Sequence, residues 1–184
     1  GTYRIQYNTS GKVTEVINPE GNAACFSYDK TGNKLTERFF ERVSDQEYVL
    51  QSRSEFQYDE TGRMIRAGVN LFDHHDEVVS DPDQSYLETE PGRLLVSRFF
   101  YDQGGRLIRT TDQSNREFTQ EYDLAGRKTK QTDPYGNEIS YTYDRAGNLI
   151  RTDRMEVIRN AGGDMTGKRF FAMEGKFDEL NRIT

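Results

Sequence analysis

Residues 122–150 read YDLAGRKTKQTDPYGNEISYTYDRAGNLI and contain two kinds of turn signal. The first is Tyr-Asp-x-x-Gly, which begins at Tyr122 and again at Tyr143. The second is Asp-Pro-x-Gly, which begins between them at Asp133. Asp at the first position of a type I turn accepts backbone N–H groups, and Gly at the fourth adopts positive φ without strain. The stretch therefore predicts that each repeat, from one tyrosine to the next, contains two strands and two turns.

The Tyr-Asp-x-x-Gly signal recurs along the chain of 184 residues. Its complete copies are Tyr28, Asp29 and Gly32; Tyr58, Asp59 and Gly62; Tyr101, Asp102 and Gly105; Tyr122, Asp123 and Gly126; and Tyr143, Asp144 and Gly147. Degenerate copies begin at Tyr7 and Phe177. We therefore interpret residues 1–184 as a single array of about seven units, and function must be sought at the level of the array.

The turn geometry also predicts which residues pair across each hairpin. Positive φ at the glycine creates a bulge, and the bulge places each tyrosine opposite the second residue after that glycine. Most of these pairs join an aromatic to an apolar side chain, which suits a sheet face: Tyr7 with Val13, Tyr58 with Met64, Tyr101 with Leu107, Tyr143 with Leu149 and Phe177 with Ile183. Two pairs instead contain lysine, Tyr28 with Lys34 and Tyr122 with Lys128. At these, either the lysine stems pack on the rings or the register is shifted.

Apolar residues alternate with a period of two, as in the expected strands 107–111 and 138–143, and no helical stripe persists over more than two turns. The chain is therefore predicted to be all-β, built of antiparallel β-hairpin repeats. Three longer insertions interrupt the period near residues 39–56, 69–100 and 154–177. We expect a hairpin around residues 44–46, a polar loop at 73–90 with a turn at 91–94, and a turn at 160–164.

Composition favours a thin sheet over a thick core. Only 33% of residues are hydrophobic and the mean hydropathy is -0.93, yet the chain has 11 Tyr and 11 Phe, and aromatic residues recur in register with the turns. Sheets with aromatic stripes need no compact centre. Cys25 is expected to be a small half-buried strand residue. The net charge of -6 and the scattered basic residues argue against nucleic acid as a partner, and no apolar stretch approaches the ~20 residues of a membrane span.

Local features do not single out a reaction. His74 and His75 would point to opposite faces of a strand, so we expect a solvated loop there and no metal site. The acidic residues around them lack the spacing of a calcium loop. Each repeated aspartate already has a task in its turn, and no phosphate loop, nucleophile elbow or Cys-His pair is present. We predict no catalytic, cofactor-binding or metal-binding residues and no enzyme activity.

The aromatic residues allow two interpretations. Cross-strand packing accounts for those in the Tyr-Asp register. Exposed tyrosine beside Asp and Arg can also stack on sugars or peptides, and the candidates for such ligand-facing aromatics lie outside that register: Tyr48, Tyr86 and Tyr135.

The repeat resembles the RHS or YD-repeat family, whose unit is a Tyr-Asp-x-x-Gly-Arg-Leu turn followed by an Asp-Pro-x-Gly turn. Residues 122–150 carry the match most clearly, and the repeat covers essentially the whole chain. The resemblance implies a long sheet that winds in a spiral and forms part of a hollow shell. In bacterial polymorphic toxins and Tc toxin components such shells enclose a cytotoxic polypeptide, and in animal teneurins a similar shell belongs to an adhesion protein.

The resemblance implies a non-catalytic shell segment whose partners are the rest of its shell and an enclosed toxin or effector polypeptide. It also implies a secreted or cell-surface location, although no signal peptide is visible. The chain ends in the middle of a repeat, so we expect a fragment of a longer array. The alternative is a recognition module that binds carbohydrate or a protein through the inserted loops. Unpaired strands at the sheet edges predict self-association.

Overall fold

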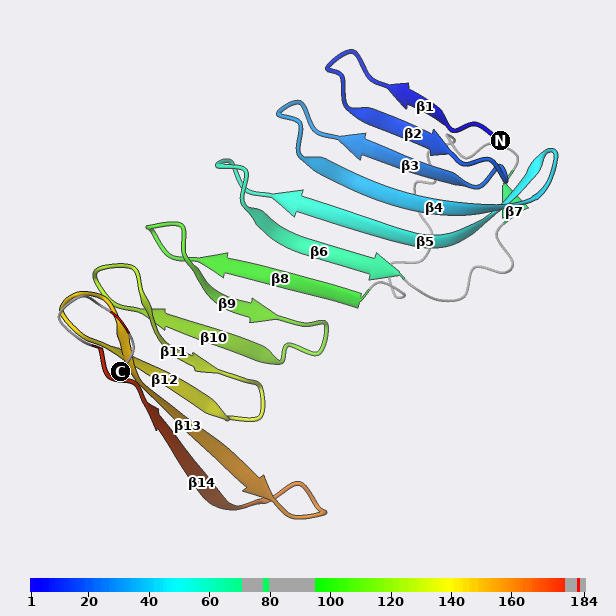
Figure 1. Ribbon diagram of the computed structural model, residues 1–184. Helices are drawn as coiled ribbons and strands as arrows, with labels where there is room; N and C mark the ends of the chain where they lie inside the picture. Colours follow the sequence, from blue (N-terminus) through cyan, green and yellow to red (C-terminus); the bar gives the residue numbers. More distant parts are fainter. Residues whose placement is uncertain (71–77, 80–94, 178–181, 183–184) are drawn as a thin grey trace. The chain divides into compact units, whose positions relative to one another are not determined.

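The computed structural model describes residues 1–70, 78–79, 95–177 and 182, and over these residues the chain is all-β and antiparallel, as predicted (Figure 1). It forms two compact units, Gly1–Arg98 and Phe99–Thr184. The strands are β1 (Arg4–Tyr7), β2 (Val13–Ile17), β3 (Ala23–Tyr28), β4 (Lys34–Ser44), β5 (Glu47–Tyr58), β6 (Met64–Asn70), β7 (Val78–Val79), β8 (Leu95–Tyr101), β9 (Leu107–Thr111), β10 (Glu117–Tyr122), β11 (Lys128–Thr132), β12 (Glu138–Tyr143), β13 (Leu149–Arg159) and β14 (Met165–Glu174).

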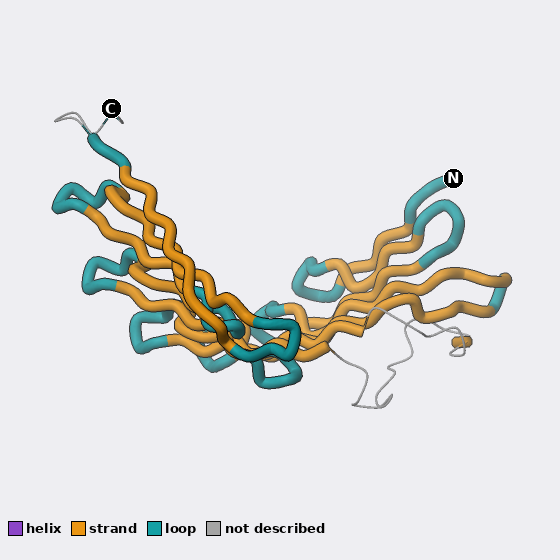
Figure 2. The backbone as a smooth tube through the Cα atoms, turned by 90° about the horizontal axis from the view of Figure 1, so that it is seen from below, coloured by secondary structure: helices purple, strands orange, loops and turns teal. Residues whose placement is uncertain are grey.

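In each unit the strands form a single layer, in which strands that are consecutive in the chain are neighbours in the sheet (Figure 2). The short β7 is the exception, since it pairs with β5. The two strands expected at residues 107–111 and 138–143 are β9 and β12. No helix of the described residues is long and apolar enough to cross a membrane.

Both kinds of turn adopt one geometry. In the Tyr-Asp turn, Asp123 N donates to Arg127 O (2.9 Å) and Gly126 N donates to Asp123 O (3.0 Å). In the Asp-Pro turn, Asp133 N donates to Asn137 O (2.9 Å) and Gly136 N donates to Asp133 O (3.0 Å). Gly126 has φ of 83°, and Asn115, which replaces glycine in the weakest copy of the second turn, has φ of 56°. Asn tolerates this region better than most residues, so the turn survives the replacement.

The cross-strand pairs confirm the expected register. Tyr7 pairs with Val13, Tyr58 with Met64 and Tyr143 with Leu149, each with a register shift at the tyrosine. The register is unchanged at the two lysine pairs, Tyr28 with Lys34 and Tyr122 with Lys128. Lys34 accordingly lies near an aromatic ring, with its Nζ 4.8 Å from the centroid of Phe26. The pair of Phe177 with Ile183 lies partly outside the described residues, and the pair of Tyr101 with Leu107 stays a prediction.

Two insertions have the expected form. Residues 39–56 lengthen β4 and β5, which meet in a hairpin at residues 45–46. Residues 154–177 contain the end of β13 and all of β14, joined by the turn at Asn160, where Asn160 N donates to Asp164 O (2.9 Å). In the third insertion, the polar loop at 73–90 with His74 and His75 falls largely outside the described residues, and the turn at 91–94 falls wholly outside them.

The core is small and lies in the first unit. It comprises Ile17, Ala23, Cys25, Phe40 and Leu50, all at most 9% exposed. The prediction for Cys25 was wrong in degree, because its side chain is 1% exposed and not half-buried. The cause is the first insertion: Phe40 of β4 and Leu50 of β5 both belong to the cluster that covers Cys25.

Candidate functional site

The repeated aspartate is fully engaged by its own turn. Asp29 Oδ1 accepts hydrogen bonds from the backbone N of Thr31 (2.9 Å) and Asn33 (2.8 Å), and Oδ2 accepts one from Asn33 Nδ2 (2.9 Å). Asp123 repeats the pattern, since its Oδ1 accepts from Arg127 N (2.9 Å). These bonds satisfy N–H groups that the hairpin ladder leaves unpaired.

The same bonds keep the aspartates ionised. The hydroxyl of Thr31, followed by the side chain and backbone of Asn33, lowers the pKa of Asp29 to about 2. The pKa of Asp123 is lowered chiefly by the backbone N–H of Arg127. The pKa of Asp144 is lowered in the same direction, chiefly by the side chain of Asn148. A general acid at neutral pH needs a raised pKa, so these carboxyl groups have the opposite property.

Two arginines that directly follow a turn glycine, Arg106 and Arg127, link neighbouring hairpins. Arg127 Nε donates to Asp123 Oδ2 of its own turn (2.7 Å), and its Nη1 donates to Asp144 O of the next turn (3.2 Å). Its Cζ lies 4.7 Å from the ring centroid of Tyr143, within the range of a cation–π contact. Arg106 does the same with the following hairpin, because its Nη1 donates to Asp123 O (3.0 Å) and its Cζ lies 5.2 Å from the Tyr122 ring.

The tyrosine hydroxyl makes a second link. Tyr143 OH donates to Lys128 O, Tyr122 OH to Leu107 O and Tyr28 OH to Val13 O, each at 2.9 Å. In each case the acceptor lies 15 residues earlier. It is therefore the residue two places after the glycine of the preceding turn. The regular spacing between successive tyrosines thus places each hydroxyl on the neighbouring hairpin.

The second turn links hairpins at the other end of the strands. Asn137 follows Gly136; its Nδ2 donates to Asp133 Oδ2 (2.7 Å) and its Oδ1 accepts from Val157 N (2.8 Å). Asn22 makes the equivalent bond, because its Oδ1 accepts from Arg42 N (3.0 Å). Both ends of these hairpins are thus joined to the next strand by polar side chains.

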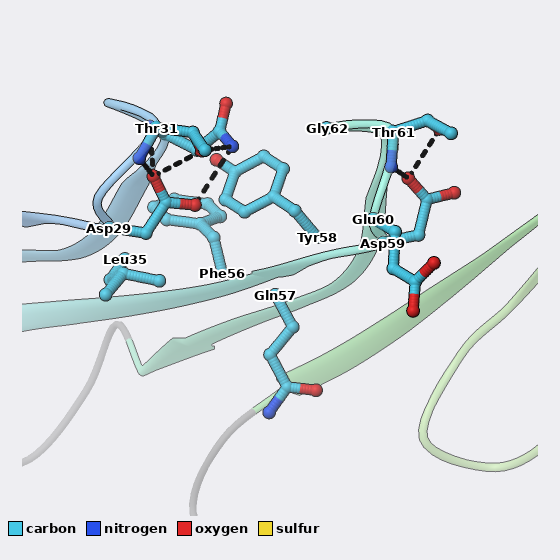
Figure 3. Close-up of a pocket in the computed structure, with 11 residues that line it drawn as sticks. Asp29, Thr31, Leu35, Phe56, Gln57, Tyr58, Asp59, Glu60, Thr61 and Gly62 are labelled. Atoms are coloured by element: carbon cyan, nitrogen blue, oxygen red, sulfur yellow. Dashed lines mark hydrogen bonds between the residues drawn. The ribbon is translucent and has the colours of Figure 1, made fainter.

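A pocket of about 630 Å³ lies between the Asp29 and Asp59 turns of the first unit (Figure 3). The Tyr58 ring stands between the two turns with its hydroxyl toward Asp29, and Leu35 and Phe56 lie at its base. Burial, followed by the charge of Asp29, raises the pKa of the Tyr58 hydroxyl. The lining includes three acidic residues and no basic one.

The three aromatics predicted to face a ligand differ in their surroundings. Tyr135 is 56% exposed in the second turn of its unit and lies near Arg116, whose pKa is raised chiefly by Asp112 and further by Tyr135. Tyr48 is half-buried and packs against the small core, and its role as a ligand-facing aromatic stays a prediction. Tyr86 lies outside the described residues. In the described part of the chain, no group of three or more His, Cys, Asp or Glu side chains is placed to hold a metal ion.

Comparison with known protein families identifies a sequence pattern that contains these turns. The sequence pattern described as RHS Repeat matches residues 101–138. The chain carries an RHS repeat. The matched RHS segment runs from the end of β8 to the start of β12 and includes the turns at Asp102, Asp112, Asp123 and Asp133. The resemblance inferred from the Tyr-Asp turns is confirmed there.

Three solved structures show partial similarity to this chain. A crystal structure of TcdB2-TccC3 without its hypervariable C-terminal region is 14% identical with a TM-score of 0.49, and one of TcdB2-TccC3-TEV is 12% identical with 0.47. A Tc holotoxin pore of Photorhabdus luminescens is 12% identical with 0.46. Each match covers 98% of this chain but 11% of the other, so this chain spans about a ninth of those proteins' length. No curated protein matches the sequence.

The sequence did not lead us to predict the links between neighbouring hairpins. It assigned no contact to the residue after the turn glycine, although Arg106 and Arg127 at this position contact the next hairpin. It also left Asn22 and Asn137 without a role. The repetition of these residue types directly after the turn glycines was the available signal.

Proposed function

We propose that this chain is a non-catalytic structural segment of an RHS-repeat shell, and that the shell encloses or presents a toxin or effector polypeptide. One observation carries the structural part: the Tyr, Asp and Arg side chains of the repeat bond to their own turn and to the adjacent hairpin. A carboxylate held by its own turn and a tyrosine hydroxyl bonded to the neighbouring hairpin are not free to act on a substrate.

The enclosing role is supported by the architecture of the repeat. A single layer of hairpins, linked at both ends by side chains, can extend by adding units without a thick core. Such a sheet separates two faces, which is what a shell requires. The partners of the chain would be the remaining repeats of its shell and the enclosed polypeptide, and the protein would act outside the cell that makes it.

Protease protection in the natural protein tests this proposal. We expect mass spectrometry after proteinase K treatment to find a polypeptide segment that survives together with the RHS array. The double variant Gly126→Val/Gly147→Val should expose that segment, because valine opposes the positive φ of both turns (83° and 95°). The matched control Gly126→Asn/Gly147→Asn should retain protection. Absence of a protected segment, or protection unchanged by valine, contradicts enclosure.

Recognition of a ligand is the second candidate, and the exposure of Tyr135 favours it. Tyr135 is 56% exposed, and its backbone carbonyl accepts a hydrogen bond from Arg159 Nη2 (3.0 Å), which positions the turn. Exposed tyrosine can stack on a sugar face. A glycan array should then show binding that Tyr135→Ala abolishes, whereas an array without binding leaves the shell as the supported function.

A further inference from the structure

The pocket between the Asp29 and Asp59 turns coincides with a change in the repeat. In three other repeats a cation from the preceding turn lies against the tyrosine ring: Lys12 at Tyr28 (5.8 Å), Arg106 at Tyr122 (5.2 Å) and Arg127 at Tyr143 (4.7 Å). Each of these cationic residues directly follows its turn glycine. Before Tyr58 the same position is occupied by the short, neutral Asn33.

Contacts of the turn glycines confirm that Asn33 occupies the equivalent place. A Cβ built on Gly147 would meet Arg127 Nη1 at 3.8 Å, and one built on Gly32 would meet Lys12 Nζ at 3.5 Å. On Gly62 it would meet Asn33 Nδ2 at 3.9 Å. Asn33 therefore faces the following turn as its basic counterparts do, but its side chain ends at the amide.

The surroundings retain what a cation would contact. The Tyr58 ring lines the pocket, as do Asp29 and Asp59. Asp59 forms an ion pair with Arg63 (2.7 Å), whereas the hydrogen bonds to the Asp29 carboxylate come from neutral groups of Thr31 and Asn33. The guanidinium groups of Arg106 and Arg127 also donate to the backbone carbonyl of the next turn aspartate, and the equivalent carbonyl here is that of Asp59.

We propose that this pocket binds a guanidinium group, supplied by an arginine side chain or by a small guanidine. The group would lie over the Tyr58 ring, donate to Asp59 O and balance the charge of Asp29. Guanidinium is favoured over ammonium because it is planar, stacks on rings and offers several donors in fixed directions. In the second unit, the chain itself places guanidinium groups at the equivalent position, in Arg106 and Arg127.

Titration with methylguanidinium chloride tests the site, with sodium chloride at equal ionic strength as the reference. One cation–π contact with one charge-assisted hydrogen bond at a half-exposed site corresponds to a dissociation constant on the order of 10 mM. Amide NMR signals of residues 59–62 should shift and saturate in this range. Signals of residues 144–147 should stay unchanged, because Arg127 fills that position. No saturable shift at 59–62, or equal shifts in both turns, would overturn the proposal.

Variants separate the site from general effects of the probe. Asn33→Arg should abolish the shifts, because the new side chain occupies the pocket as Arg127 does in its repeat. Tyr58→Leu should weaken binding about 5-fold, and Tyr58→Phe should change it less than about 2-fold, since the ring makes the contact. Binding that persists unaltered in Asn33→Arg contradicts the assignment.

The reciprocal variant, Arg127→Asn, tests the same site in the second unit. Arg127→Asn should create a second site, so that methylguanidinium now shifts the signals of residues 144–147. Failure of this variant to gain binding would overturn the proposal. Nα-acetylarginine amide distinguishes the two sources: tighter binding than methylguanidinium assigns the pocket to an arginine side chain, and weaker binding assigns it to small guanidines.

Discussion

Replacing Tyr143 by phenylalanine isolates the hydroxyl link between two hairpins. Tyr143 OH donates to Lys128 O at 2.9 Å, and the substitution removes this donor while it keeps the ring beside Arg127, whose Cζ lies 4.7 Å from the centroid. The cation–π contact and most of the packing therefore remain. The measured change reports the hydrogen bond.

The expected magnitude follows from the burial of the pair. Both residues are half-buried, so the carbonyl that loses its donor is partly accessible to water. A hydrogen bond of this kind contributes about 1 kcal/mol to the free energy of unfolding. For a unit of the size of residues 99–184, that corresponds to a fall in Tm of about 4–8 °C.

Urea unfolding, followed by circular dichroism and by amide hydrogen exchange in β11 and β12, measures the effect. Tyr141→Phe is the matched control, because Tyr141 lies two residues earlier in β12 and its hydroxyl makes no hydrogen bond within the described residues. We expect Tyr143→Phe to lower the free energy of unfolding and to accelerate exchange in β11. If both variants unfold alike, the hydroxyl does not link the hairpins and the reasoning is refuted.

Three further predictions concern the turns and the sheet edge. Gly126→Val should lower the free energy of unfolding by at least about 1 kcal/mol, and Gly126→Asn should lower it by less. Both effects come from backbone strain at φ of 83°, because no atom lies within 4 Å of the added Cβ. Urea midpoints measure the two changes. Because the pKa of Asp29 in the folded chain, about 2, lies below its unfolded value near 4, the stability that its carboxylate contributes is present above about pH 4 and falls as pH drops toward 2. Asp29→Asn should reduce that acid sensitivity yet keep the turn, whereas Asp29→Ala should lower the urea midpoint at pH 7 as well. The exposed Phe170 and Met173 of β14 (72% and 76%) predict concentration-dependent association in sedimentation, which lysine at both positions should suppress and which a strict monomer would contradict.

The register of the hairpins could be predicted from sequence because its causes are local. An aspartate and a glycine three residues apart determine the turn, and the bulge at the glycine determines the pair, so Tyr58 and Met64 could be matched without knowledge of any other strand. The prediction succeeded even at Lys34, where the pairing partner has the wrong polarity for an apolar face.

The links between hairpins could not be predicted in the same way, because they depend on how one hairpin lies against the next. The bond from Tyr143 to Lys128 joins residues that no single turn determines. The burial of Cys25 likewise depends on Phe40 and Leu50, which come from an insertion whose packing the repeat does not encode. Non-local contacts of this kind need the pairing of β3 with β4 and of β4 with β5 to be known first.

The first insertion shows why the sheet edge formed by the Tyr-Asp turns (the turn edge) stays in register, while the opposite edge, formed by the second turns, varies. Thr119 pairs with Arg109, which puts Tyr122, three residues on, beside Arg106. Glu55 pairs with Thr36, which puts Tyr58, three residues on, beside Asn33.

The insertion therefore leaves the turn edge in register, although the interval from Tyr28 to Tyr58 is longer than the interval from Tyr101 to Tyr122. The two intervals differ by an odd number of residues. Lengthening both strands of a hairpin adds residues in pairs, so one unpaired residue remains and must be accommodated somewhere within the hairpin. It is accommodated at the far end of the hairpin, where β4 and β5 are joined by residues 45–46 and β9 and β10 by the longer turn 112–116. The register shifts between Phe39 and Phe40 and between Arg42 and Ser44 cancel each other, because Ser44 again pairs in the register of Thr36. The pocket beside Tyr58 is thus not a by-product of the longer strands. We attribute it to one side chain, Asn33, at the position from which Arg127 reaches the next turn in its own repeat, and we expect the single substitution Asn33→Arg to close it.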